Sequence, residues 1–170
     1  QAALTHIREA AEKAALAAGL GEAVFRQAQA VLGLAGANSL GVRGAIAACL
    51  PVGRTTIVSD AMTALQGALG DGDGALAILG TGSAFVSRKG ENVEIAGGRG
   101  FMLSDHAGGA RLGRELLEAS LLAFDGMGER GALTDSALAR FEGDARQVTV
   151  FSRQAPAADY AAFAPLVFEH

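Results

Sequence analysis

The sequence predicts a mixed α/β fold, because short apolar runs of strand length alternate with longer segments of helical periodicity. Three apolar runs between residues 75 and 96 are separated only by glycine-containing turns, which is typical of antiparallel strands. On both sides of this stretch, apolar residues recur every three or four positions. A chain of 170 residues, 50% of them hydrophobic, can bury one sizeable core.

The N-terminal part is expected to alternate helices with strands. Residues 1–18 have helical spacing, and Gly19 ends that helix. Residues 30–37 predict a buried strand that leads into a glycine-rich turn. A helix over 40–50, closed by Pro51, is expected to follow.

The β-branched run at 54–59 predicts the next strand, and Asp60 begins a helix that extends to about Leu69. An aspartate at this point has a structural explanation, since an N-cap aspartate accepts a hydrogen bond from a free N–H group at the helix start. A functional carboxylate at a strand end is the alternative. Taken alone, the residues favour the cap.

The turn between the first two central strands, Gly80–Ser83, is unusual for a plain hairpin. Its two glycines let the backbone approach a ligand closely, and Thr81 and Ser83 add hydroxyls beside main-chain N–H groups. Such a loop suits an anion, most often a phosphate. Because the motif is short, a simple tight turn stays open as the alternative.

The C-terminal part is expected to be helical. An apolar stripe predicts a core helix over 112–124, and a further helix is expected after Pro156. The run at 148–151 fits either a short strand or the start of a helix. The stripe of the first helix consists of Leu112, Leu116, Leu117, Leu121 and Phe124. The face of the last helix consists of Tyr160, Phe163, Leu166 and Val167.

Three motifs, in this order and spacing, carry a resemblance to a known family: SDA at 59–61, AILGTGSA at 77–84 and GGRGFMLSDHAGGARLG at 97–113. They resemble the sugar-kinase branch of the actin-like (ASKHA) ATPases. The group most similar to them is the BadF/BadG/BcrA/BcrD ATPase family, which includes N-acetylglucosamine and glucosamine kinases. The resemblance extends through most of the chain.

The resemblance implies an α/β fold of the actin-like ATPase (ribonuclease H-like) type. Residues 1–59 would then be the remainder of the N-terminal lobe. Residues 60–170 would be the inter-lobe region and the first part of the C-terminal lobe. The family's first phosphate hairpin and its adenosine-binding glycine motif find no match, so the chain is expected to be a fragment that lacks both.

The resemblance also implies roles for single residues. Asp60 would be the general base that accepts the proton of the acceptor hydroxyl. The phosphate end of ATP would be bound by Gly80, Thr81, Gly82 and Ser83. The sugar would be contacted by Asp60, Ser83, Ala84, Gly98, Arg99, Gly100, Phe101 and Asp105. No protein metal ligand is expected, and Mg²⁺ is implied by the reaction class together with ATP.

Two positions depart from the family pattern. Arg99 stands where family members usually carry Trp, so a guanidinium replaces an aromatic ring beside the sugar. His106 stands where Glu or Gln is common, and no catalytic role is assigned to it.

The expected function is that of an ATP-dependent amino-sugar kinase acting on N-acetylglucosamine or glucosamine, and the sequence does not choose between these sugars. One alternative within the family is an ATPase activator of a dehydratase or reductase, which holds an iron–sulfur cluster with cysteines. Cys49 is the single cysteine and lies in an apolar segment, which disfavours that alternative. A non-catalytic sugar-sensing module is the third interpretation.

Composition restricts the partners. The net charge is −4 and Trp is absent, which argues against a nucleic-acid surface. No apolar stretch reaches the roughly 20 residues of a membrane helix. The expected partners are therefore an amino sugar and ATP, with a homodimer allowed, and the expected location is the cytoplasm.

Overall fold

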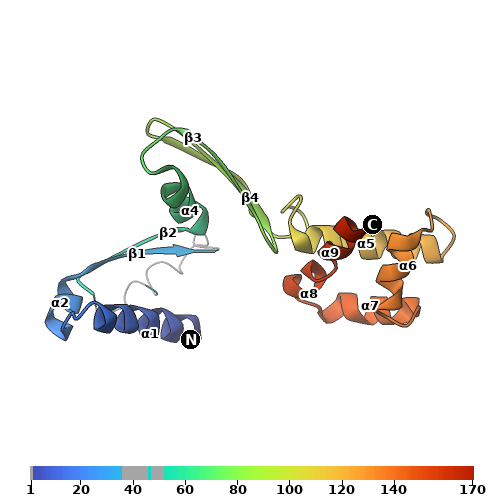
Figure 1. Ribbon diagram of the computed structural model, residues 1–170, viewed down its shortest axis with the longest axis horizontal. Coiled ribbons are helices and arrows are strands. Elements are labelled where there is room, and N and C mark those ends of the chain that lie inside the picture. The colour runs from blue at the N-terminus through green and yellow to red at the C-terminus, as the bar shows by residue number, and fades with distance from the viewer. Residues whose placement is uncertain (1, 36–45, 47–51) are drawn as a thin grey trace. The chain divides into compact units, whose positions relative to one another are not determined.

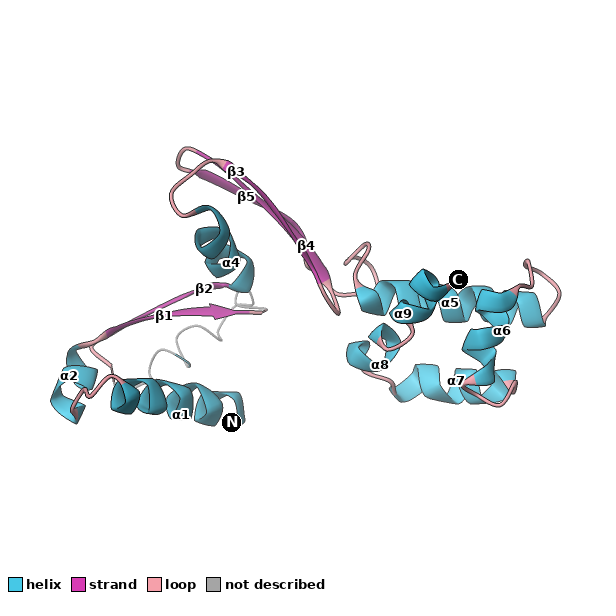
Figure 2. Cartoon of the chain, in the orientation of Figure 1, coloured by secondary structure: helices cyan, strands magenta, loops and turns pink. Residues whose placement is uncertain are grey.

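The computed structural model describes residues 2–35, 46 and 52–170, and it divides the chain into two compact units, Gln1–Asp73 and Gly74–His170. The first unit mixes helices with strands, whereas the second begins with strands and continues with helices alone (Figures 1 and 2). The mixed α/β class is therefore confirmed. The expected boundary at residue 60 separates the two lobes of the actin-like fold, which are not the same as these two units, and it stays a prediction.

The first unit contains a two-stranded parallel sheet. Its described elements are α1 (Ala2–Ala17), α2 (Glu22–Gln27), β1 (Gln29–Leu34), β2 (Arg54–Ser59) and α4 (Asp60–Leu69). The predicted first helix and the predicted strand at 54–59 are confirmed, and the strand expected at 30–37 ends earlier, at Leu34. The predicted helix over 40–50, Cys49 and Pro51 lie outside the described residues, apart from residue 46.

The parallel pairing determines where α4 begins. Leu34 and Ser59 are register partners, so β1 and β2 end at the same edge of the sheet. A Cβ atom added to Gly33 would overlap the side chain of Thr63, which shows how closely α4 lies against β1. Asp60 therefore lies at the carboxyl edge of the parallel strands, which is the edge where open α/β sheets bind ligands.

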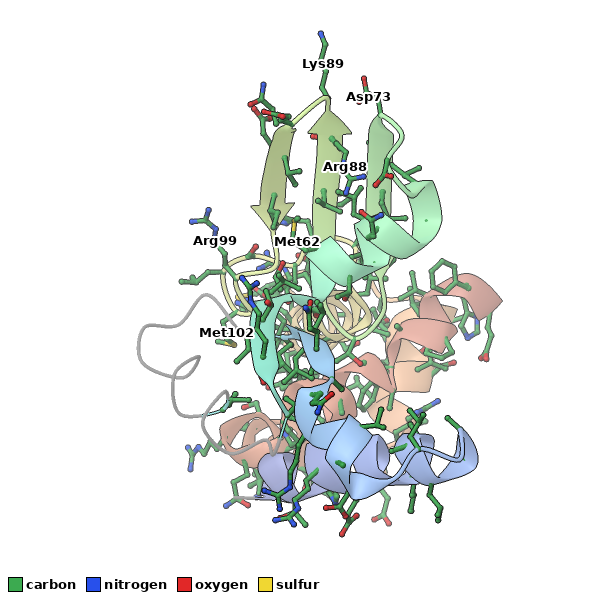
Figure 3. All side chains as sticks on the ribbon, turned by 90° about the vertical axis from the view of Figure 1, so that its left-hand side faces the viewer. Met62, Asp73, Arg88, Lys89, Arg99 and Met102 are labelled. Atoms are coloured by element: carbon green, nitrogen blue, oxygen red, sulfur yellow. The ribbon has the colours of Figure 1, made fainter. Side chains whose placement is uncertain are left out.

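The second unit opens with an antiparallel meander of β3 (Gly74–Leu79), β4 (Ser83–Lys89) and β5 (Asn92–Gly97). The three predicted central strands are confirmed, each extended by a residue or more. Leu79 pairs with Ser83, so the turn between β3 and β4 is tight. Lys89 stands at the tip of the other turn (Figure 3).

The rest of the second unit is a group of helices with its own core (Figure 1). They are α5 (Gly109–Phe124), α6 (Ala132–Ala139), α7 (Ala145–Gln154), α8 (Ala157–Ala161) and α9 (Ala164–Glu169). The buried core residues are Ala110, Leu116, Leu117, Ala137, Leu138, Phe141, Val148, Tyr160, Phe163 and Leu166. Among the described residues, no helix is long and apolar enough to cross a membrane.

Aromatic side chains hold these helices together. The rings of Phe141 and Phe163 stack at 5.6 Å between centroids, and Phe151 meets the edge of both. Phe151 also contacts Tyr160 edge-on, with 5.2 Å between centroids. Pairs of this geometry add about 0.5–1.5 kcal/mol each beyond the area they bury. The core of α5–α9 is thus built around one aromatic cluster.

Three expectations for the helices are corrected or resolved. The run at 148–151 belongs to a helix, α7. The single helix expected after Pro156 is divided into α8 and α9, because Pro165 lacks an N–H group and occupies the first turn of a new helix. Phe124, expected in the core, is 53% exposed at the last position of α5.

Candidate active site

Asp60 is the first residue of α4 but not its cap. The N-cap is Ser59, whose Oγ accepts a hydrogen bond from the Met62 N–H at 3.3 Å. The Asp60 side chain is exposed, and its Oδ1 accepts the Ala61 N–H at 2.9 Å. The interpretation of Asp60 as the N-cap is therefore wrong, because the residue before it fills that position.

The glycine turn Gly80–Ser83 is closed on itself and fixed to α5. Gly80 N donates to Gly82 O at 2.9 Å. The carbonyls of Gly80 and Thr81 accept hydrogen bonds from Gly109 N at 2.7 Å and Ala110 N at 2.8 Å. The first amides of α5 are thus used by the turn and are not available to a free anion.

Two other amides of the same turn are available. Across the described residues, the N–H groups of Thr81 and Gly82 make no hydrogen bond within the chain. The Thr81 side chain is exposed beside them. Adjacent main-chain N–H groups of this kind form concave sites for anions.

Ser83, the last residue of the turn, is only 5% exposed. Its Oγ donates to the His106 carbonyl at 2.7 Å, and its own carbonyl accepts the Gly98 N–H at 2.9 Å. Ser83 therefore contacts both the beginning and the end of the loop that joins β5 to α5. Its predicted contacts with phosphate and sugar stay predictions.

The loop after β5 requires glycine. Gly97, Gly98 and Gly100 have φ angles of 76°, 65° and 94°, a region that residues with a side chain rarely adopt. Between them, the exposed Arg99 side chain extends away from the loop (Figure 3). The guanidinium therefore has room to reach a ligand.

The far end of this loop is anchored to the helices. The ring of Phe101 lies 5.2 Å from that of Tyr160, centroid to centroid. The carbonyl of Met102, labelled in Figure 3, accepts a hydrogen bond from Arg114 Nη1 at 2.8 Å. The aromatic core thus fixes one end of the loop, while its glycines keep the backbone open to a ligand.

Asp105 is a carboxylate 9% exposed and held in a defined orientation. Its Oδ1 accepts the Gly100 N–H at 3.1 Å, and its φ angle is 55°. A Cβ atom added to Gly82 would lie 2.5 Å from Asp105 Oδ2, so the carboxylate lies directly against the glycine turn.

The second unit therefore brings most of the predicted site residues together. Ala84 joins them, because a Cβ on Gly98 would lie 3.3 Å from the Ala84 Cβ. Asp60 belongs to the first unit, so its place relative to the others stays a prediction.

The sequence did not indicate two residues that help to build the site, Gly108 and His106. A Cβ on Gly108 would lie 2.7 Å from the Gly82 carbonyl carbon, so Gly108 allows the turn and α5 to meet. His106 takes part through its main-chain carbonyl, which residue type cannot reveal. The adjacent glycines of the AGG run at the start of α5 are the one signal that could have indicated a close approach.

A hollow of about 600 Å³ adjoins the glycine turn. It is lined by Gly80, Thr81, Gly109, Ala161, Ala164, Pro165, Phe168 and Glu169. Across residues 2–35, 46 and 52–170, no group of three or more His, Cys, Asp or Glu side chains could hold a metal ion. A magnesium ion that arrives on a nucleotide needs no such cluster, because phosphate oxygens and waters supply most of its ligands.

Two curated relatives are similar in sequence. The glucosamine kinase GspK of Vibrio cholerae is 33% identical over 171 residues, which cover 100% of this chain and 58% of that protein. The N-acetylmuramic acid/N-acetylglucosamine kinase of Clostridium acetobutylicum is 34% identical over 83 residues, 48% of this chain and 27% of that protein. The chain thus spans less than two thirds of the length of these relatives.

Two solved structures are similar in fold. A putative N-acetylglucosamine kinase from Chromobacterium violaceum superposes with a TM-score of 0.78 at 32% identity, covering 91% of this chain and 55% of that one. A putative N-acetylglucosamine kinase from Porphyromonas gingivalis gives a TM-score of 0.63 at 23% identity, covering 92% and 56%. The second of these supports the fold alone. The model of the BadF/BadG/BcrA/BcrD ATPase family matches residues 1–170, and the chain therefore belongs to that family.

Proposed function

We propose that the complete protein is an ATP-dependent amino-sugar kinase, which transfers the γ-phosphoryl group of ATP to a hydroxyl of N-acetylglucosamine or glucosamine. The observation that carries this proposal is a glycine turn with free amides packed directly against the carboxylate of Asp105. An anion site and a hydroxyl-binding site would then adjoin each other, as phosphoryl transfer requires. The proposal concerns the complete protein, since the chain covers 58% of GspK.

The phosphate end of ATP would lie on Gly80–Ser83. The amides of Thr81 and Gly82 and the Thr81 hydroxyl are the donors that this turn offers. Mg²⁺ would enter bound to the ATP phosphates, where it neutralises charge on the transferred group. The hollow beside Gly80 and Thr81 has room for a further part of the nucleotide.

The sugar would be held by Asp105 and by the loop from Gly98 to Phe101. A carboxylate accepts hydrogen bonds from sugar hydroxyls, and such charge-assisted bonds are about twice as strong as neutral ones. Arg99 would donate to a sugar oxygen from the position where the family usually has Trp. Ala84 would pack beside Gly98 at the edge of the same site.

Asp60 would act as the general base. The sugar hydroxyl oxygen forms a bond to the γ-phosphorus, the bond from phosphorus to the β–γ bridging oxygen breaks, and ADP leaves with that electron pair. The hydroxyl proton passes to the Asp60 carboxylate. The exposed position of this side chain at the carboxyl edge of β1 and β2 supports the role, because a base has to reach its proton. This role presupposes the actin-like fold that the motifs imply, in which two lobes face each other.

An ADP-release assay on the complete protein tests the proposal. MgATP is supplied alone and then with glucosamine, N-acetylglucosamine or glucose, and the sugar phosphate is measured in parallel. We expect ADP release that depends on an amino sugar and equals the sugar phosphate formed. ADP release without a sugar would indicate an ATPase activator instead, and sugar binding without turnover would indicate a sensing module.

A further inference from the structure

A closed ring of contacts links three segments of the second unit. The Gly98 N–H donates to the Ser83 carbonyl, two residues later the Gly100 N–H donates to Asp105 Oδ1, and the Ser83 hydroxyl donates to the carbonyl of His106. Ser83 contacts both ends of the loop between β5 and α5, the beginning through its main chain and the end through its side chain. Its hydroxyl is therefore what closes the ring.

The segment on which Ser83 acts has an uncommon backbone. Asp105 and Ala107 have φ angles of 55° and 65°, and His106 lies between them. Residues with a side chain seldom adopt this region, and they keep such angles only where neighbouring contacts impose them. The 2.7 Å bond from Ser83 holds the carbonyl between these two residues, so it is placed to impose that backbone.

We propose that Ser83 is a positioning residue that fixes the orientation of the Asp105 carboxylate, and that it does so through His106. This inference rests on the proposed function, in which Asp105 binds sugar hydroxyls. Two observations oppose a direct role of the Ser83 hydroxyl as a ligand of phosphate. The side chain is 5% exposed, and its only proton is already donated to a main-chain carbonyl.

The same residue ends the phosphate turn, so its position couples two halves of the site. The turn is tied to α5 through Gly80 and Thr81, and the Asp105 segment is tied to the turn through Ser83. Loss of the Ser83 hydroxyl should therefore weaken sugar binding and leave the turn attached to α5. A direct phosphate ligand would show the opposite pattern.

A double-mutant cycle in the complete protein tests the proposal. Calorimetry gives the Kd of the amino sugar and of MgADP for the wild type, Ser83→Ala, Asp105→Asn and the double variant. We expect Ser83→Ala to raise the sugar Kd about two- to ten-fold, as for one neutral hydrogen bond, with the MgADP Kd changed less than about two-fold. In the Asp105→Asn background the same substitution should add less than about two-fold, because Ser83 acts through Asp105.

Additive effects on the sugar Kd, or a larger effect on MgADP than on the sugar, would overturn the proposal. Ser83→Cys keeps the size of the side chain and weakens the hydrogen bond, so the same criteria apply to it if Ser83→Ala does not fold. Ser87→Ala is the matched control on β4, and it should change neither Kd. If the wild type binds no amino sugar, the proposed function itself is overturned. If the wild type binds the sugar and both Ser83→Ala and Ser83→Cys bind it with the same Kd, only this inference is overturned.

Discussion

The two candidate carboxylates of the site are held in opposite ways. Asp60 is exposed at the start of α4, and its one hydrogen bond comes from the adjacent Ala61 N–H. Asp105 is 9% exposed, accepts the Gly100 N–H and has a φ angle of 55°. The first side chain can turn without disturbing the fold, whereas the second is part of its local packing.

This difference matches the two proposed roles. A general base accepts a proton from the substrate and later releases it to water, so contact with solvent suits this role. A carboxylate that orients a sugar is effective only when its own geometry is fixed. Substitutions at the two residues should therefore separate kcat from KM.

The largest effect is expected from Asp60→Asn in the complete protein. Asparagine has a similar shape but cannot accept the hydroxyl proton, so kcat should fall about a hundred- to ten-thousand-fold. The melting temperature should stay nearly the same, because Ser59 continues to cap α4. Steady-state kinetics and a thermal melt together check both parts.

The neighbouring Ser59→Ala variant is the control for Asp60. It removes the cap and should destabilise the protein by about 0.5–2 kcal/mol while kcat stays within a few-fold. A full-length Asp60→Asn enzyme with near-normal kcat would show that the carboxylate of Asp60 is not the base.

The next effect is expected at Asp105→Ala, which should raise the sugar KM about ten- to a hundred-fold, since a charge-assisted hydrogen bond contributes about 1.5–3 kcal/mol. The KM for ATP should change much less. Initial rates with one substrate varied at a time measure both constants. Equal increases in both would instead assign Asp105 a structural role only.

A third prediction concerns the packing beneath Asp105. Gly108→Ala places a Cβ 2.7 Å from the Gly82 carbonyl carbon and 2.9 Å from the Asp105 carbonyl, both of which are main-chain atoms. Overpacking of this kind typically destabilises by about 1–3 kcal/mol. Denaturant unfolding should show the loss, together with a raised sugar KM.

Gly131→Ala is the matched control for this variant. Like Gly108, Gly131 is the N-cap of a helix without a side-chain cap, but a Cβ there meets nothing within 4 Å. It should lose only the preference for glycine over alanine at an N-cap, about 1 kcal/mol or less, and Gly108→Ala should lose clearly more. If the two variants unfold alike, the loss at Gly108 comes from the cap and not from contact with Gly82.

The smallest effect is expected at Thr81→Val. The exposed hydroxyl would contribute one hydrogen bond to a charged phosphate in contact with solvent, so the KM for ATP should rise about ten-fold, the low end for a bond to a charged group. The sugar KM serves as the internal control and should not change. Unaltered nucleotide affinity in calorimetry would remove Thr81 from the site.

The sequence could predict what local pattern determines. Apolar runs between glycine turns predicted β3, β4 and β5, and the end of the β-branched run at Ser59 predicted where α4 begins. The sequence did not show that Ser59, and not Asp60, is the N-cap of α4. Both residue types are good caps, and a sequence pattern does not fix the helix start to one residue.

Contacts between distant segments could not be predicted. The bond from Ser83 to His106 uses a main-chain carbonyl, and the positive φ angles of Asp105 and Ala107 depend on that neighbourhood. The division between α8 and α9 was missed, because an apolar face continues across the break at Ala162 and Phe163. Packing, and not local periodicity, decides such features.

The start of α5 has a consequence for amide hydrogen exchange. The first amides of a helix normally have no acceptor and exchange quickly with solvent. Those of Gly109 and Ala110 instead donate to the carbonyls of Gly80 and Thr81, so they exchange only when the glycine turn lifts from the helix. The protection factors of these two amides would therefore measure how often the turn opens. The increase in protection when a nucleotide binds would measure how strongly the nucleotide keeps the turn closed.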